Sequence, residues 1–106
     1  MTATLGTRWD RATFHAELGR WIEAARELEP LVAEEPDASA VRTLLARAYY
    51  HSAQLRRAEE QARRLVADRP DDGYAQLLLG RSLQRQGRHD EASAPLRLAA
   101  ALGVAR

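Results

Sequence analysis

Apolar side chains recur at three- and four-residue spacing through most of the chain, and residues 39–69 show the pattern most clearly. The first stripe in that segment consists of Val41, Leu44, Leu45, Ala48 and Tyr49. The second stripe consists of Leu55, Ala58, Ala62, Leu65 and Val66. This spacing places apolar residues on one helical face, so the segment predicts two helices joined by a short polar turn at 52–54. No segment shows the alternation of a half-buried strand, and an all-α protein is predicted.

The same pattern repeats at an interval of 34 residues. Pro36 and Pro70 are separated by this interval, and so are Ala24, Ala58 and Ala92. A fixed period of this length is the sequence signature of a stacked repeat protein, in which each unit buries its apolar face against the next. Three units, at approximately 5–38, 39–72 and 73–106, account for nearly the whole chain. We therefore expect a single domain over residues 1–106.

Small residues stand at fixed places in these units. Ala46 and Gly80 fall inside the predicted first helices, and the recurring alanines fall inside the second helices. A side chain of one carbon or none lets two helix axes approach to roughly 8–10 Å. Glycine inside a helix costs roughly 1 kcal/mol relative to alanine, so Gly80 predicts a close helix contact at that point.

The recurring alanines, prolines and other residues of the three units together resemble the tetratricopeptide repeat. The third unit matches its signature spacing through Leu79, Gly80, Leu83, Gly87, Ala92, Leu96 and Ala99. The middle unit matches through Leu45, Ala46, Tyr49, Ala58 and Pro70, and the first through Gly19, Trp21, Ala24, Leu28 and Pro36. Arg11 and His15 depart from the pattern, which leaves the register of the first helix open. The resemblance implies three tandem helix-turn-helix repeats that form a short right-handed α-solenoid, with the first helices lining a concave groove.

Helical spacing places a mixture of arginines and aromatic residues on that groove. The predicted groove residues are Trp9, Arg47, Tyr50, His51, Tyr74, Leu77, Arg81, Gln84 and Arg85. Arginine and aromatic residues are enriched in protein-binding surfaces, and guanidinium groups bind carboxylates bidentately. We therefore expect a protein-interaction scaffold that binds an acidic peptide or a C-terminal carboxylate. The alternative is that these arginines form only a solvated helix face.

Some members of the family clamp a chaperone's C-terminal carboxylate with lysine, arginine and asparagine. The sequence contains neither lysine nor asparagine, so that clamp is not expected here. All 16 basic residues are arginine, which fits either a GC-rich genome or guanidinium chemistry. The net charge is only +1, so no global field indicates nucleic acid as the partner. Weak binding of RNA through Arg56, Arg57, Arg63 and Arg64 remains an alternative, although Glu59 and Glu60 lie among them.

The sequence favours no catalytic, metal or cofactor chemistry. It has no cysteine, and His15, His51 and His89 fall in three different units. No pair of ligands has metal-site spacing, and the serines show no nucleophile motif. We expect a protein that is not an enzyme and has no cofactor. The N-terminal segment lacks a signal-peptide pattern and no apolar run is long enough for a membrane span, so a cytoplasmic location is expected.

The two ends of the array are predicted to leave apolar side chains open. At the N-terminal end these are Phe14 and Leu18. At the C-terminal end they are Leu96, Ala99, Ala100 and Leu102, because too few residues follow for a seventh helix. Exposed apolar patches often mark association. The sequence therefore predicts a homodimer through the C-terminal helix, and a structural or oligomerisation module is the alternative function.

Overall fold

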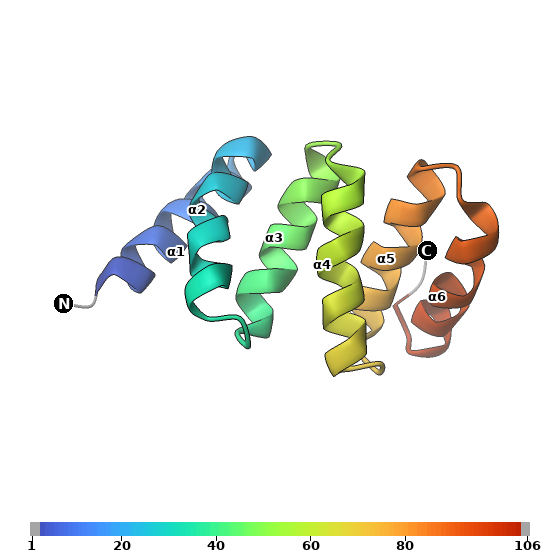
Figure 1. The fold of residues 1–106 in the computed structure, drawn as a ribbon. Helices are drawn as coiled ribbons and strands as arrows, with labels where there is room; N and C mark the ends of the chain where they lie inside the picture. Colours follow the sequence, from blue (N-terminus) through green and yellow to red (C-terminus); the bar gives the residue numbers. More distant parts are fainter. Residues whose placement is uncertain (1–2, 105–106) are drawn as a thin grey trace.

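The computed structural model describes residues 3–104, which fold into helices connected by short turns. The helices are α1 (Ala3–Glu17), α2 (Trp21–Glu34), α3 (Ser39–His51), α4 (Leu55–Asp68), α5 (Gly73–Arg85) and α6 (His89–Ala101). The described part of the chain contains no strand. The helices follow one another along a row (Figure 1), and the molecule measures 45 × 24 × 21 Å. The predicted all-α solenoid is confirmed.

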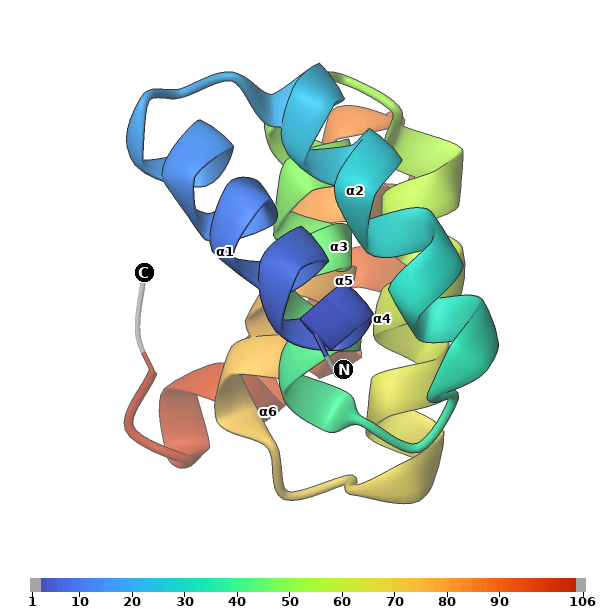
Figure 2. The ribbon, with the colours of Figure 1, turned by 90° about the vertical axis from the view of Figure 1, so that its left-hand side faces the viewer.

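Each helix packs against the next one in the chain, and α3 also contacts α5. Viewed from the N-terminal side, α2 and α4 lie along one side of the row, and α1 and α3 lie beside them (Figure 2). The fold is therefore built from three helix pairs, α1–α2, α3–α4 and α5–α6.

The turn inside each pair has the same hydrogen bond. The backbone N–H of Arg20 donates to His15 at 2.8 Å, that of Gln54 to Tyr49 at 2.8 Å, and that of Arg88 to Leu83 at 3.0 Å. The donors are separated by 34 residues, and so are the acceptors. The register of α1, which the sequence left open, is therefore the same as that of α3 and α5.

The small residues lie where helices meet. Ala24, Ala58 and Ala92 are buried in the second helices, and Ala46 and Gly80 are buried in the first helices. A Cβ atom placed on Gly80 would lie 2.5 Å from Cδ2 of Leu96 on α6, too close for a normal contact. The expected close approach of α5 and α6 at Gly80 is confirmed.

Two buried polar side chains hold the loops between pairs. Arg42 donates to the carbonyl oxygen of Pro36 at 2.8 Å, and Gln76 donates to the carbonyl oxygen of Pro70 at 3.0 Å. Arg42 and Gln76 are again 34 residues apart, so equivalent hydrogen bonds fix the two loops. Buried polar groups of this kind stabilise a structure only when they are hydrogen-bonded, as these are.

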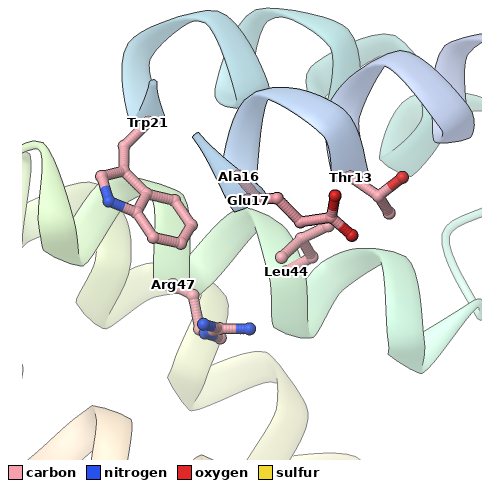
Figure 3. Close-up of a pocket in the computed structure, with 6 residues that line it drawn as sticks. All are labelled: Thr13, Ala16, Glu17, Trp21, Leu44 and Arg47. Atoms are coloured by element: carbon pink, nitrogen blue, oxygen red, sulfur yellow. The ribbon is translucent and has the colours of Figure 1, made fainter. Parts of the chain in front are cut away.

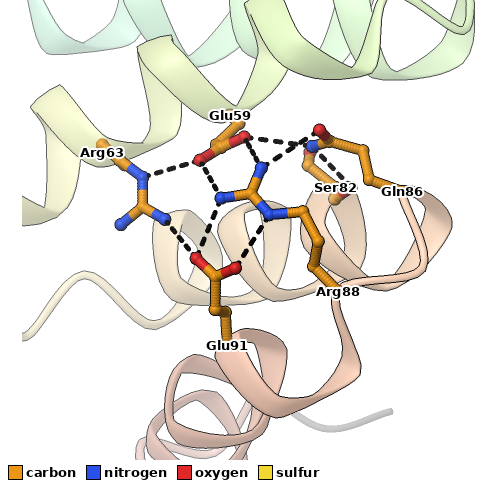
Figure 4. Close-up of polar contacts among 6 residues, drawn as sticks. All are labelled: Glu59, Arg63, Ser82, Gln86, Arg88 and Glu91. Atoms are coloured by element: carbon orange, nitrogen blue, oxygen red, sulfur yellow. Dashed lines mark hydrogen bonds and ion pairs between the residues drawn. The ribbon is translucent and has the colours of Figure 1, made fainter.

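A charged network joins the second pair to the third (Figure 4). Glu59 on α4 is buried and accepts hydrogen bonds from Arg88 at 2.6 Å, Arg63 at 2.9 Å and Gln86 at 3.1 Å. Burial alone raises the pKa of Glu59, but the hydrogen bonds from Arg88, Gln86 and Arg63 outweigh it and lower the pKa to about 2. Arg88 also binds Glu91 at 2.9 Å, so the network ties α4 to the turn before α6.

The C-terminal end differs from the sequence expectation at two residues. Leu96 was expected to be open, but it is half-buried and packs against Gly80 and the core. Ala99 was expected to be open, but it is fully buried, because it lies two turns after Ala92 on the helix face that contacts α5. The large exposed apolar residues at this end are Leu98 on α6, which is 48% exposed, and Leu102 directly after α6, which is 44% exposed. At the N-terminal end Phe14 is 56% exposed, as expected.

The turn at Ala53 generates a stability prediction. Ala53 has a φ of +62°, whereas the equivalent turn positions are Gly19 at +73° and Gly87 at +78°. A Cβ atom at Gly87 would meet nothing within 4 Å, so only backbone strain separates alanine from glycine there. A side chain in the left-handed region costs roughly 1–2 kcal/mol. The greater entropy of glycine in the unfolded chain offsets part of this cost, so Ala53→Gly should raise the free energy of unfolding by about 0.5–1 kcal/mol.

The reciprocal variant Gly87→Ala should lower the free energy of unfolding by a similar amount. Urea denaturation of both variants and the wild type measures the two changes. A stabilised Gly87→Ala protein or a destabilised Ala53→Gly protein would contradict the strain argument.

Candidate functional site

Three pockets, two of which share lining residues, lie along the surface formed mainly by the first helices of the pairs. We call this surface the groove and name each pocket after one aromatic residue that lines it. The Trp21 pocket, of about 250 Å³, is lined by Thr13, Ala16, Glu17, Trp21, Leu44 and Arg47. The Trp9 pocket, of about 430 Å³, is lined by Trp9, Thr13, Ser39, Ala40, Thr43, Leu44 and Arg47. The Tyr50 pocket, of about 390 Å³, is lined by Tyr50, Leu77, Arg81, Gln84 and Leu96.

Arg47 lies at the junction of the first two pockets. The Arg47 side chain extends from α3 (Figure 3). The Trp21 ring lies on one side of it, and Glu17 and Leu44 lie on the other. Its guanidinium carbon lies 5.4 Å from the centre of the Trp21 ring. Its Nε atom is buried and has no hydrogen-bond partner among the described residues.

A chain of ring contacts connects Arg47 with the Tyr50 pocket. Trp21 stacks on His51 with their ring centres 4.5 Å apart. His51 and Tyr50 form an edge-to-face pair with their ring centres 5.4 Å apart. The Arg85 guanidinium lies 5.0 Å from the centre of the Tyr50 ring and donates to the Tyr50 carbonyl oxygen at 3.3 Å. Contacts of this kind hold the guanidinium planes in fixed orientations.

These cations also act on the histidine between them. Burial lowers the pKa of His51 below its usual value, and the positive charges of Arg47 and Arg85 lower it further. The neutral form of the imidazole is therefore favoured relative to that of an isolated histidine.

The groove arginines differ in their pairing from six other arginines, which bind carboxylates of the chain. Arg8 and Arg11 bind Glu27, Arg64 binds Asp37 and Asp68, and Arg69 binds Asp71, while Arg63 and Arg88 bind Glu59. Arg47, Arg81 and Arg85 have no ion-pair partner among the carboxylates of the described residues. Because nearby carboxylates of the chain do not neutralise these three guanidiniums, they remain available to an external anion.

The structure places six of the predicted groove residues in the linings of these pockets. Trp9, Arg47, Tyr50, Leu77, Arg81 and Gln84 line the pockets, and Arg85 adjoins them through Tyr50. His51 instead stacks behind Trp21 and lines a separate pocket at the edge of the molecule with Arg20 and Ile22. Tyr74 is partly exposed and is not among the residues that line the three groove pockets; burial raises its pKa, and nearby Arg47 and Arg81 act in the opposite direction.

Trp21 was not among the predicted groove residues. It opens α2 directly after the turn at 18–20, where its ring reaches over α3. The equivalent positions 34 and 68 residues later carry Leu55 and His89. An aromatic residue at the first position of a second helix was the signal that could have placed it in the groove.

No helix among the described residues has both the length and the apolar character needed to cross a membrane. Within residues 3–104, His, Asp and Glu side chains do not gather in groups of three or more that could hold a metal ion.

A family model described as the tetratricopeptide repeat matches residues 15–81. The chain belongs to the tetratricopeptide repeat family. The expectation drawn from the alanine and proline columns is thereby confirmed, and the repeats account for both the helix pairs and the shared turns. Members of this family are protein–protein interaction scaffolds and are typically non-enzymatic. No curated protein matches the chain by sequence.

Solved structures with the same fold include several MamA chains. A MamA mutant superimposes with a TM-score of 0.88 at 19% identity, and the match covers 96% of this chain and 57% of that chain. MamA MSR-1 superimposes with a TM-score of 0.86 at 18% identity, and the match covers 93% of this chain and 57% of that chain. A MamA RS-1 double mutant superimposes with a TM-score of 0.84 at 21% identity, and the match covers 93% of this chain and 56% of that chain. These tetratricopeptide repeats thus span a little over half the length of the MamA chains, and the likeness shows the fold.

Proposed function

We propose that the groove binds an acidic segment of a partner protein. The observation that carries this proposal is the set of three arginines, Arg47, Arg81 and Arg85, which have no ion-pair partner among the described carboxylates. They lie on adjoining first helices beside aromatic rings. Hydrogen bonds between arginine and carboxylate are roughly twice as strong as neutral ones, and arginine and aromatic residues dominate binding at many interfaces.

The ring contacts favour this proposal further. Arg85 is held against Tyr50 and Arg47 lies beside Trp21 before any ligand arrives. Binding then immobilises fewer side chains, and each ordered side chain would otherwise cost roughly 0.5–1.5 kcal/mol.

The arginines on α4 support a nucleic-acid partner less well. Arg63 and Arg64 are each paired with carboxylates of the chain, and Arg57 donates to Gln54 at 3.0 Å. Carboxylates offset the charges of Arg63 and Arg64, so the phosphate backbone of RNA would meet a weaker field there than four unpaired arginines would give. The groove therefore remains the stronger candidate site, and a protein segment its stronger ligand.

Peptide titration tests the groove directly. A fluorescent peptide containing a run of glutamates should bind the wild type more tightly than the same peptide with glutamines. The double variant Arg81→Glu, Arg85→Glu should weaken binding of the glutamate peptide by at least about tenfold, because it replaces attraction with repulsion. Fluorescence anisotropy at fixed salt measures the affinities.

The matched control is Arg26→Glu, Arg56→Glu, which makes the same charge change at exposed positions on α2 and α4. Its affinity should stay within about twofold of the wild type, since an exposed charge far from the ligand is screened by salt. Equal losses in the two double variants, or no preference for glutamate over glutamine, would refute the groove proposal.

A second candidate function is self-association through α6. Leu98 on α6 and Leu102 directly after it are exposed, whereas the equivalent positions carry Arg64 and Asp68 on α4, and Pro30 and Glu34 on α2. An apolar pair at outward positions that are charged on α4 favours a contact between two copies. We infer a homodimer in which α6 of one copy packs against α6 of the other.

Light scattering after size exclusion tests the dimer. The measured mass of the wild type should rise toward that of a dimer as the concentration increases. The variant Leu98→Arg, Leu102→Asp copies the residues of α4 and should stay monomeric, while Ile22→Arg, at an exposed site on α2, should behave like the wild type. A wild type that is monomeric at every concentration would rule out this contact.

A further inference from the structure

We propose that the Trp21 pocket holds one aromatic side chain of the bound segment, so that the groove recognises an aromatic residue next to acidic residues. This inference rests on the proposed function, because one segment has to occupy both parts of the groove. The Trp21 pocket and the Tyr50 pocket supply the two halves of that recognition.

The size and walls of the Trp21 pocket fit a single side chain. Its volume of about 250 Å³ lies below the roughly 300–1,000 Å³ typical of small-molecule sites. Trp21, Leu44 and Ala16 supply apolar surface, while Glu17 and Arg47 contribute polar groups to its lining. A ring inserted between Trp21 and Leu44 would bury apolar area on both faces.

The pocket exists because one small residue replaces larger ones. Ala16 is equivalent to Tyr50 and Gln84 in the next two repeats, and both of those side chains line the Tyr50 pocket. In the first repeat the missing side chain leaves open space beside Trp21. An aromatic residue of the ligand would then fill the place that Tyr50 occupies in the second repeat.

The Trp21 ring is positioned before the ligand arrives. His51 stacks on it with 24° between the planes, and Arg47 lies near it on the neighbouring helix. Side chains held in this way lose little freedom on binding, which favours affinity. Aromatic rings in contact contribute beyond the area they bury.

Charge divides the groove into two halves. Glu17 lines the Trp21 pocket together with Arg47 and offsets its positive charge, whereas no carboxylate is among the residues that line the Tyr50 pocket. Arg81 lines the Tyr50 pocket and Arg85 adjoins Tyr50. The aromatic residue of the ligand therefore belongs at the end formed by α1, and its acidic residues belong at the end formed by α5.

Three kinds of peptide test this division. The probes are fluorescent peptides with a run of glutamates and one phenylalanine at either end, the same peptides with alanine for phenylalanine, and the same peptides with glutamine for glutamate. The wild type should bind at least one phenylalanine peptide about tenfold more tightly than its alanine counterpart, the effect expected from burying one aromatic ring.

The variants assign the preference to the pocket. Ala16→Tyr fills the pocket with the residue that the second repeat carries at this position, and Trp21→Ala removes its wall. Both should reduce the preference for phenylalanine to less than about twofold and keep the preference for glutamate over glutamine. Circular dichroism checks that each variant is folded. If Trp21→Ala does not fold, Ala16→Tyr alone tests the assignment.

Each result separates the two proposals. If the wild type prefers glutamate but does not distinguish phenylalanine from alanine, the aromatic site is refuted and the acidic groove stands. If the preference for phenylalanine survives in Ala16→Tyr, the ring binds elsewhere and the assignment to this pocket is wrong. If no peptide binds the wild type, the proposed function fails and this inference fails with it.

Discussion

The close approach of the two helices in each pair determines where every other part of the molecule lies. Ala24, Ala58 and Ala92 are buried on the second helices, and at Gly80 the side chain of Leu96 occupies the space that a Cβ atom would need. Larger side chains at these points would separate the helix axes, since interaxial distance follows the side chains at the contact. The groove would then change shape, because its lining comes from helices held at this spacing.

The repeat also explains why charge changes along the groove. Equivalent positions on α1, α3 and α5 carry Thr13, Arg47 and Arg81 in one column. A second column carries Glu17, His51 and Arg85. The backbone repeats with a fixed period while the side chains do not, so the surface becomes more basic from the first repeat to the third. A solenoid can in this way present different chemistry at its two ends without any change of fold.

The helices, the small-residue contacts and most groove positions could be predicted from the sequence, because all three depend on local periodicity and on one repeat interval. Contacts between side chains from different repeats could not. Glu59 pairs with Arg88 across 29 positions, and the stacking of Trp21 on His51 spans 30, so neither follows from helical spacing alone. The error at Ala99 was of another kind: the residue is small and near the end of the chain, but its place on the helix faces α5.

The most direct test compares the same substitution at two alanines of α4. Ala58 is buried in the contact between helices, whereas Ala67 is exposed. Ala58→Leu should lower the free energy of unfolding by about 2 kcal/mol because it overpacks a tight contact. Ala67→Leu should change it by less than about 0.5 kcal/mol. Urea denaturation of the two variants measures both values, and an equal effect at the two positions would contradict the claim that close helix approach holds the fold together.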